Sequence, residues 1–448
     1  MFLFYRLLFP FLLVAALPVY LPRMLRRGGY RNGFRQRFGL GWKVPPTQPG
    51  RSRIWIQAVS VGEVNAVEVL LDHLSELPSP PEVVITTTTS TGHAKLQSIQ
   101  SPVLVATGYF PLDTPLATNP AWNAIQPDLF CLFEGEIWPE HLRAARKRAV
   151  PALLLNARIS DRSFRRWQRF PLLAKRLLSL LSEVSTASPL DQARFQELAP
   201  DDLSIKEYGN LKADFPDTPA PAPAERLALG TELGLFHQLS EDDISAIPVI
   251  VGVSTWPGEE DLLLETLRAL KAHRPEARLL LVPRHAERRR EIGAILQRYP
   301  FSAVFRSQRL QQINPISEQN HDVAVLDSTG ELSRFCRVGT LAFVGKSLFE
   351  NRGGQSPFDT LRARVPTVFG SEMSNFRSIA NSLLAAGAAQ EVTEENAQSR
   401  ILHLVDHPEE RRAIVEAGAR WLAANRGAAA RTAQAISDWL KASRPASS

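Results

Sequence analysis

The sequence has few cysteines and lacks the short motifs that identify many nucleotide-dependent and metal-dependent enzymes. Only two of its 448 residues are cysteines, Cys131 and Cys336, and both lie in apolar runs, which excludes a disulfide framework and favours buried, reduced thiols. It contains neither a G-x-G-x-x-G dinucleotide fingerprint nor a Walker P-loop. Asp-x-Asp and Cys-x-x-Cys pairs are absent, and the nine histidines show no metal-ligand spacing. We therefore expect no metal site and no cofactor.

The composition is that of an ordinary globular protein, with 44% hydrophobic and 22% charged residues, which excludes collagen-like, coiled-coil and wholly disordered chains. The length favours two or three domains. The net charge of +6 is unevenly distributed, because residues 1–50 contain eight basic and no acidic residues, so that the remainder carries −2. A nucleic-acid-binding protein would spread basic residues over its folded surface, and we expect no nucleic-acid partner.

Residues 1–21 are almost entirely apolar, interrupted by Arg6, Pro10 and Pro18, and are about long enough to cross a bilayer. A cleaved signal peptide is disfavoured because bulky, arginine-rich sequence follows. Two arrangements stay open: a single span with a cytoplasmic basic flank, or a helix lying in the inner leaflet with its arginines on phosphate headgroups. Both predict an anchor on anionic inner-membrane phospholipid that leaves the rest of the chain on the cytoplasmic face.

After Gly50, apolar strand-like runs alternate with helical stretches, which is typical of parallel sheets covered on both faces. The predicted runs are Ile54–Ser60, Val83–Thr89, Val103–Ala106, Leu129–Phe133, Ala152–Asn156, Val249–Ser254, Leu279–Pro283, Ala303–Arg306, Val323–Asp327, Leu341–Gly345 and Thr367–Gly370. A Pro/Ala-rich stretch, Phe215–Ala224, separates the two series and reads as a linker. We therefore predict an α/β protein with an anchor over 1–50, Rossmann-like domains over 51–215 and 248–448, a linker over 216–247, and terminal helices in the second domain.

Polar residues follow the strands of the first predicted domain, at the sheet edge where open α/β folds bind their ligands. Glu63 opens a helix after the first strand, and Glu134 and Glu136 follow the fourth strand. Carboxylates that share a cleft raise one another's pKa, which prepares a general base. Each of these acids could instead simply cap a helix. Arg158 and Lys212 add cations at the same edge.

The second domain has similar strand ends, rich in glycine and polar residues. Ser254–Glu260 follows a strand and opens a helix, which suits the binding of an anion by backbone N–H groups. Further strand ends are Leu281–His285, Asp327–Leu332 and Val344–Ser347, with a Gly-Gly turn at Arg352–Asp359.

In their order along the chain, these segments resemble the 3-deoxy-D-manno-octulosonic acid (Kdo) transferases through SVGE, EGEIWP, NARIS, GNLKAD, STWPGEE, LVPRH, DSTGEL, AFVGKSL and RGGQSP. The resemblance covers about residues 1–390. It implies a GT-B glycosyltransferase, with two Rossmann-like domains facing across a cleft. The implied reaction is an inverting transfer of Kdo from CMP-Kdo to a lipid A precursor, lipid IVA, in lipopolysaccharide inner-core synthesis. CMP-Kdo is a substrate, so the resemblance implies no cofactor.

The resemblance also assigns roles to residues. It implies that Glu63 is the general base and that Glu134 and Lys212 stabilise the transition state. The expected contacts with the CMP part of the donor are Pro283, Arg284, Thr329, Gly330, Glu331, Ser356, Pro357, Phe358 and Asp359.

Several positions depart from the family pattern. The family has His-Asn-Pro and a glutamate where this chain has Gln355-Ser356-Pro357 and Asp359, a histidine at Trp256 and a small residue at Lys346. Two alternatives therefore stay open: a GT-B transferase for another donor, a UDP-sugar or CMP-sialic acid, and a non-catalytic membrane scaffold. A reductase is disfavoured by the missing glycine fingerprint.

Overall fold

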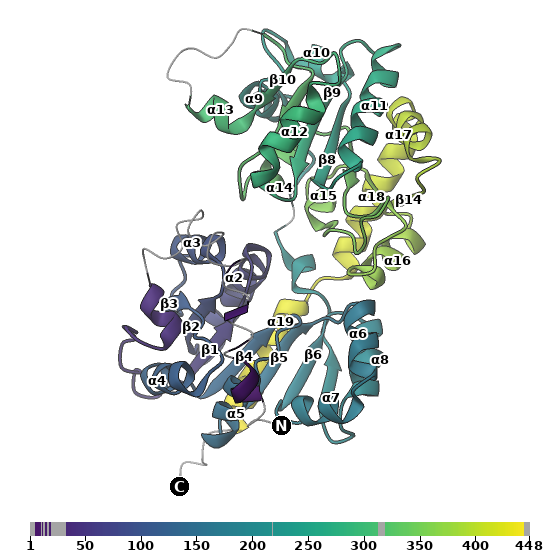
Figure 1. Ribbon diagram of the computed structural model, residues 1–448. Helices are drawn as coiled ribbons and strands as arrows, with labels where there is room; N and C mark the ends of the chain where they lie inside the picture. The colour runs from purple at the N-terminus through teal and green to yellow at the C-terminus, as the bar shows by residue number, and fades with distance from the viewer. Residues whose placement is uncertain are drawn as a thin grey trace. The chain divides into compact units, whose positions relative to one another are not determined.

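Two parallel β-sheets organise the chain, each in its own unit, as the computed structural model shows (Figure 1). The structure describes residues 5–9, 11, 14, 15, 18, 33–216, 218–311 and 319–442. Unit 1 comprises Met1–Phe215 and Asn425–Ser448, and unit 2 comprises Pro216–Ala424.

Unit 1 holds a seven-stranded sheet in the order β3-β2-β1-β4-β5-β6-β7. Its strands are β1 (Arg53–Gln57), β2 (Glu82–Thr87), β3 (Leu104–Tyr109), β4 (Leu129–Phe133), β5 (Ala152–Ala157), β6 (Glu183–Thr186) and β7 (Ser204–Glu207). Its helices are α2 (Val61–Ser75), α3 (Ser90–Ser98), α4 (Pro115–Ile125), α5 (Pro139–Lys147), α6 (Asp161–Gln168), α7 (Pro171–Leu178), α8 (Pro189–Leu198) and α19 (Ala428–Ala442), with 3₁₀ turns η1 (Phe34–Phe38) and η2 (Leu211–Asp214).

Unit 2 holds a second seven-stranded sheet in the order β10-β11-β9-β8-β12-β13-β14. Its strands are β8 (Val249–Thr255), β9 (Arg278–Pro283), β10 (Ala303–Phe305), β11 (Val323–Val325), β12 (Leu341–Val344), β13 (Thr367–Gly370) and β14 (Gln390–Val392). Its helices are α9 (Pro223–Leu233), α10 (Glu241–Ala246), α11 (Glu259–Lys271), α12 (Arg289–Leu296), α13 (Arg306–Gln311), α14 (Leu332–Phe335), α15 (Phe358–Arg362), α16 (Arg377–Ala385), α17 (Ala397–Asp406) and α18 (Pro408–Ala424), with 3₁₀ turns η3 (Ala286–Arg288) and η4 (Cys336–Val338).

The central strands are buried on both faces, which explains their continuous apolar sequence. In β1, Ile54 and Ile56 pack into the core that includes residues of α2 and α19. Trp55 faces the other way, against Trp122 and Phe130 in the core beneath α4 and α5. In each parallel sheet the carboxyl ends of the strands thus lie on the same side of the sheet, and the predicted site residues follow these strand ends.

The structure confirms two parallel-sheet α/β units, and every strand run predicted from the sequence contains a strand. Both cysteines are free and buried, as expected. Strands β6, β7 and β14 were not predicted. Part of the expected linker is helical, because α9 and α10 occupy much of 216–247.

One domain assignment is wrong. The last helix, α19, belongs to unit 1 rather than to the domain predicted over 248–448 (Figure 1). Ile436 and Leu440 pack into the α2 core, and Asp214 accepts the backbone N–H groups of Gly427 and Ala429 at the start of the helix. The C-terminal helix therefore completes the first sheet's cover.

Most of the predicted membrane anchor lies outside the described residues. The part that is described is helical and is held to unit 1 at its start, where Tyr5 donates to Asp113 at 2.6 Å and Arg6 pairs with Glu140 at 2.7 Å. Leu7, Phe11 and Val14 are exposed. Among the residues that the structure covers, no helix combines the length and the apolar character needed to cross a bilayer.

Candidate active site

Glu63 lies in the first turn of α2, directly after the carboxyl end of β1. Ser60 is the N-cap of the helix, and its hydroxyl donates to Glu63 Oε1 at 2.9 Å, while the backbone N–H of Val59 donates to Oε2 at 2.8 Å. The residue is only 8% exposed. The hydrogen bonds of Glu63 are therefore those of a helix-capping acid, which the sequence offered as the alternative to a catalytic role.

Its electrostatics differ from those of an ordinary capping acid. Burial, and after it the negative charge of Glu134, raise the pKa of Glu63 to about 7, against the hydrogen bonds from Val59 and Ser60 and the charge of Lys212. A helix N-terminus alone would favour the ionised form. A carboxylate with a pKa near neutrality is suited to accept a proton under cellular conditions.

Glu134 follows β4 with a positive φ of 56°, a conformation that costs free energy for a residue with a side chain. Its Oε1 lies 2.6 Å from Lys212 Nζ and 3.7 Å from Arg158 Nη1. Burial acts to raise the pKa of Glu134, but the charges of Lys212 and Arg158 outweigh it and hold the pKa below its usual range. Glu134 therefore stays ionised.

Two asparagines hold the turn that presents Lys212. Asn156, at the end of β5, accepts the Leu211 backbone N–H at 3.1 Å, and Asn210 accepts the Lys212 backbone N–H at 3.0 Å. Among the described residues, the side-chain amide nitrogens of both are buried without a hydrogen-bond partner. Unpaired buried donors are uncommon in folded proteins, so these two amide groups are available to donate a hydrogen bond at the carboxyl ends of the strands.

The structure thus brings together Glu63, Glu134 and Lys212, the three residues predicted from the sequence to act in catalysis. Neighbouring carboxylates whose environments push their pKa values apart can divide the roles of proton acceptor and fixed charge. Glu136, the third acid singled out in the sequence, has a pKa raised by burial. Within the described residues no group of His, Cys, Asp and Glu could hold a metal ion.

In unit 2, two of the expected nucleotide-binding segments are joined through α14. Ser333, in this short helix, donates to Asp359, and Glu331 precedes the helix as its N-cap. Glu331 is already engaged, because Arg306 Nη2 donates to its Oε1 at 3.0 Å and the Ser328 hydroxyl donates to Oε2. Sequence reasoning missed Arg306 and Ser333, since their partners lie 25 and 26 residues away along the chain.

The other expected nucleotide contacts follow the ends of three strands of the second sheet, β9, β11 and β12. Pro283 is buried at the end of β9, and Arg284 after it is exposed, without a side-chain partner among the described residues. Thr329 and Gly330 form an exposed turn, and the positive φ of Gly330, 91°, suits a glycine. Ser356 is half-buried, whereas Pro357 and Phe358 are buried.

The motif Ser254–Glu260 differs from the expectation of a backbone cradle for an anionic ligand. The anion found there is the chain's own Glu259, fully buried, whose carboxylate accepts four backbone N–H groups at 2.9–3.2 Å: those of Trp256, Lys346, Ser347 and Leu348. Burial raises the pKa of Glu259 to about 6 in spite of these hydrogen bonds. Glu259 therefore ties α11 to the loop after β12.

Lys346 and Trp256, two residues that depart from the family pattern, contact each other. Lys346, at a positive φ of 59°, places its ammonium 4.8 Å from the centre of the Trp256 ring. The same ring meets His285 edge-on, with ring centres 5.4 Å apart. Trp256 and Lys346 thus form a cation–π pair across the ends of two neighbouring strands.

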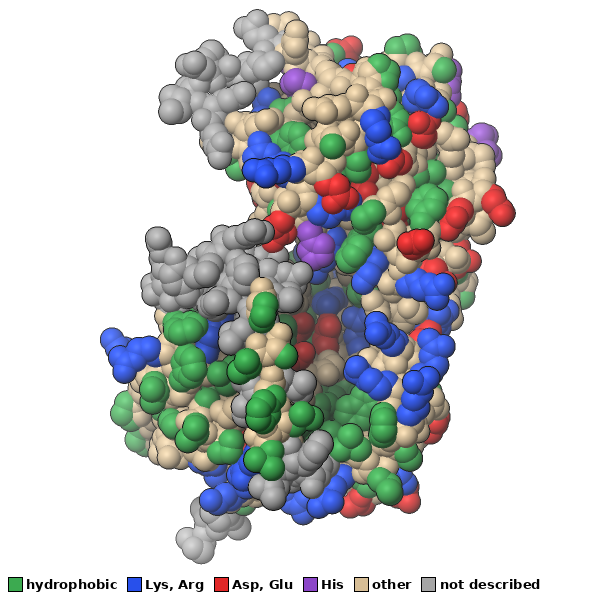
Figure 2. Space-filling view, viewed as in Figure 1, with side chains coloured by type: hydrophobic (Ala, Val, Ile, Leu, Met, Phe, Trp, Pro, Cys, Tyr) green, Lys and Arg blue, Asp and Glu red, His purple; other side chains and the backbone are tan. Residues whose placement is uncertain are grey.

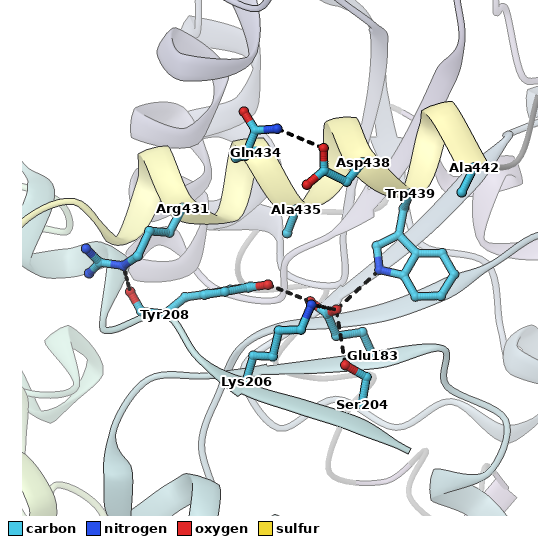
Figure 3. A pocket seen from close by; sticks show the side chains of 10 residues that line it. All are labelled: Glu183, Ser204, Lys206, Tyr208, Arg431, Gln434, Ala435, Asp438, Trp439 and Ala442. Carbon is cyan, nitrogen blue, oxygen red and sulfur yellow. Dashed lines mark hydrogen bonds and ion pairs between the residues drawn. The ribbon is translucent and has the colours of Figure 1, made fainter. Parts of the chain in front are cut away.

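A groove of about 460 Å³ lies elsewhere in unit 1, between α19 and the β6–β7 edge (Figure 3). At its base Glu183 accepts hydrogen bonds from Tyr208, Ser204 and Trp439 and pairs with Lys206 at 3.2 Å. None of the predicted site residues lines this groove. The other acid of the lining, Asp438, accepts a hydrogen bond from Gln434 at 2.8 Å, so both carboxylates already have partners within the chain.

Comparison with known proteins gives consistent results. The family described as "3-Deoxy-D-manno-octulosonic-acid transferase (kdotransferase)" matches residues 32–215. The chain is 32% identical over 427 residues to a 3-deoxy-D-manno-octulosonic acid transferase of Bordetella pertussis, covering 93% of this chain and 94% of that protein. It is 29% identical to one of Haemophilus influenzae, covering 96% and 95%.

Among solved structures, Anabaena Alr3699/HepE in complex with UDP and glucose is similar in fold, with a TM-score of 0.57, 16% identity, and coverage of 88% of this chain and 100% of that one. A UDP-GlcNAc 2-epimerase from Neisseria meningitidis gives a TM-score of 0.54 at 12% identity, covering 87% and 100%. These likenesses concern the fold alone.

Proposed function

Because the chain belongs to the 3-deoxy-D-manno-octulosonic acid transferase family, we propose that it transfers Kdo from CMP-Kdo to the lipid A precursor lipid IVA, with Glu63 as the general base. Family membership confirms the resemblance drawn from the sequence and makes the chain a glycosyltransferase. Beyond family membership, we infer the donor, the acceptor, the residue roles and the cellular location.

The raised pKa of Glu63 is the observation that carries the proposed mechanism. Inverting transfer needs a base that takes the proton of the acceptor hydroxyl while its oxygen attacks the anomeric carbon of Kdo. CMP leaves with the electron pair of the broken bond. At a pKa of about 7, Glu63 is substantially ionised at neutral pH and is still basic enough to hold the transferred proton.

Glu134 and Lys212 support this step electrostatically. Glu134 fixes the Lys212 ammonium at 2.6 Å and raises the pKa of Glu63 by its own charge. Fixed charges already in position need little reorganisation when charge develops in the transition state. Lys212 and Arg158 supply positive charge for anionic groups of donor or acceptor.

The nucleotide would bind at the strand ends of unit 2. Arg284 is an exposed cation suited to the donor phosphate, and the Thr329–Gly330 turn offers backbone groups that no side chain covers. Asp359, half-buried beside Ser333, is the candidate partner for the ribose hydroxyls. It is shorter than the glutamate of the family pattern, and Ser333 shares its carboxylate.

We place the enzyme on the cytoplasmic face of the inner membrane. Residues 1–21 and the eight basic residues of 1–50 support an anchor, either spanning or lying in the leaflet. The exposed apolar side chains of Leu7, Phe11 and Val14 agree with contact between this segment and lipid. Such a location gives access to a lipid-linked acceptor.

The direct test incubates the full-length protein with lipid IVA and CMP-Kdo and weighs the product by mass spectrometry. A mass gain of one or more Kdo units is expected, and the gain also counts the residues added. A UDP-sugar and CMP-sialic acid serve as donor controls. Turnover with either of these but not with CMP-Kdo would contradict the proposed donor, and no turnover with any donor would favour a scaffold.

A further inference from the structure

The exposed apolar surface of the protein is concentrated in unit 1. Among the described residues, all the large apolar side chains that stand exposed belong to unit 1, except Leu310. Some of them belong to the N-terminal segment, to η1 and to α4. A separate group, Phe170, Leu172 and Leu173, lies at the turn from α6 to α7, where Leu172 is 84% exposed. Exposed patches of large apolar side chains mark interaction surfaces in soluble units.

Cations surround this apolar turn. Arg162, Arg165, Arg166 and Arg169 recur at intervals of three and four residues, so they share one face of α6, and all are exposed. Phe164 and Trp167 lie on the other face and pack against the core. Lys175 and Arg176 add two exposed cations in α7. Figure 2 shows blue side chains gathered over α6, with green ones beside them toward α7.

The positive charge of this surface is not neutralised locally. Residues 162–182 contain six Lys and Arg residues and no acid. None of the six forms an ion pair within the described parts of the chain, and the neighbouring Asp161 is already paired with Arg194 at 2.6 Å. An anionic partner would therefore meet free cations.

We propose that this surface, formed by α6, α7 and the turn between them, binds the anionic headgroups of a phospholipid bilayer, as a second membrane contact besides the N-terminal segment. Exposed leucine and phenylalanine beside arginine fit the interfacial region of a bilayer, where apolar side chains enter the acyl boundary and cations meet phosphate. An acidic peptide without apolar side chains would match the arginines but leave Leu172 exposed. The inference rests on the membrane location proposed above.

The test uses the full-length protein with a cysteine at Leu172, labelled with a polarity-sensitive maleimide dye. Cys131 and Cys336 are fully buried and will not compete for the label. The matched control is Leu310→Cys, an exposed leucine of unit 2. With phosphatidylglycerol vesicles, the dye at position 172 should shift its emission to shorter wavelength and the dye at 310 should not. Phosphatidylcholine vesicles and added salt should reduce the shift.

Charge variants then test the arginines. The triple variant Arg162→Gln, Arg165→Gln and Arg166→Gln should bind vesicles more weakly. The lipid concentration that gives half of the emission shift should rise by at least about tenfold. The control removes the same charge from exposed arginines of unit 2, with Arg290→Gln, Arg412→Gln and Arg420→Gln, and should change nothing. Melting temperatures show that each variant is folded.

Co-sedimentation in the same samples separates the two proposals. A protein that sediments with the vesicles while the dye at 172 keeps its aqueous emission overturns this inference and leaves the N-terminal anchor standing. A wild-type protein that does not sediment overturns both. An equal shift with neutral and anionic vesicles overturns the role of the arginines.

Discussion

Glu63 and Glu259 occupy equivalent places in the two units, each at the start of the helix that follows the first strand of its sheet. Both are deeply buried, with 8% and 0% of their surface exposed, and burial raises the pKa of both, to about 7 and about 6. Their surroundings differ. Four backbone N–H groups cover the carboxylate of Glu259, whereas Glu63 has two donors and an anionic neighbour, Glu134.

A raised pKa alone therefore does not identify a base. The carboxylate of Glu259 is enclosed by its own chain and holds the loop after β12, which is a structural role. Glu63 lies beside ionised partners, at an edge where buried amide groups have no partner among the described residues. The same helix start fixes a loop in unit 2 and, in unit 1, holds the residue that we propose as the general base.

The largest expected effect is a loss of turnover when Glu63, but not Glu259, loses its ability to accept a proton. Glu63→Gln should lower turnover by roughly 10²–10⁴-fold, because the amide cannot accept the proton, while donor affinity stays near wild type. Single-turnover rates with CMP-Kdo measure it. Glu68→Gln is the matched control: Glu68 is a partly exposed residue of the same helix whose carboxylate pairs with Lys95 at 2.7 Å, and the variant should keep full activity. A folded Glu63→Gln enzyme with a normal rate would remove Glu63 from the mechanism.

Arg284→Ala tests whether unit 2 is the nucleotide-binding unit. Loss of a charged hydrogen bond to phosphate, about 1.5–3 kcal/mol, should weaken CMP-Kdo binding by roughly 10–150-fold. Titration calorimetry with CMP and CMP-Kdo measures it, and Arg290→Ala is the exposed control. Unchanged affinity would move the phosphate away from this arginine.

Glu259→Gln should act on stability rather than on proton transfer. The amide nitrogen would face backbone donors, and one buried donor left unsatisfied costs about 1–3 kcal/mol. Thermal unfolding should show a lower melting temperature, and the activity that remains should keep the pH profile of the wild type. A change in that profile would contradict the division of roles between the two glutamates.

The pH dependence offers a finer test. Activity should rise with pH through about 7, as Glu63 loses its proton. Glu134→Gln should move this rise in activity to lower pH, because the charge of Glu134 raises the pKa of Glu63, and Lys212→Met should move it to higher pH.

The same raised pKa of Glu63 also makes the stability of the protein depend on pH. The pKa in the folded state lies above the usual one, so the stability that Glu63 contributes is present at low pH and lost as pH rises through about 7. Glu63→Gln should therefore gain stability relative to wild type between pH 5 and pH 8.

The smallest effect concerns Lys346. Its positive φ is a conformation that glycine adopts without strain, and its contact with Trp256 contributes about 0.5–1 kcal/mol. Lys346→Gly should therefore be nearly neutral in stability, and Lys346→Ala should be less stable than the glycine variant. Chemical denaturation of the three proteins measures the difference. An alanine variant as stable as the glycine variant would contradict strain at this position.

The central strands and the three catalytic candidates could be predicted because their signals are local: buried strands read as apolar runs, and the polar residues that follow them stand out. The strands β6, β7 and β14, which lie at or next to the edge of a sheet, are short and rich in polar residues, so periodicity does not reveal them. The partners of Glu259 could not be predicted, since three of its four hydrogen bonds come from residues 87–89 positions away.

The place of α19 could not be predicted for a related reason. An amphipathic pattern shows that a helix buries one face, but not against which sheet. The deciding contacts are long-range, such as the hydrogen bond from Gly427 to Asp214, 213 residues away.

Because the chain returns to unit 1 with α19 after passing through unit 2, the two units cannot complete their folding in the order of their first strands. Unit 2 is one continuous segment, so its whole sheet is available to fold while the chain is still being synthesised. Unit 1 has to wait, because the helix that covers its sheet is translated after all of unit 2. Until then, the part of the core that receives Ile436 and Leu440 is incomplete, on the same side of the sheet as α2, the helix that carries the proposed base. Unit 1, the half in which we place the proton chemistry, is therefore completed after unit 2.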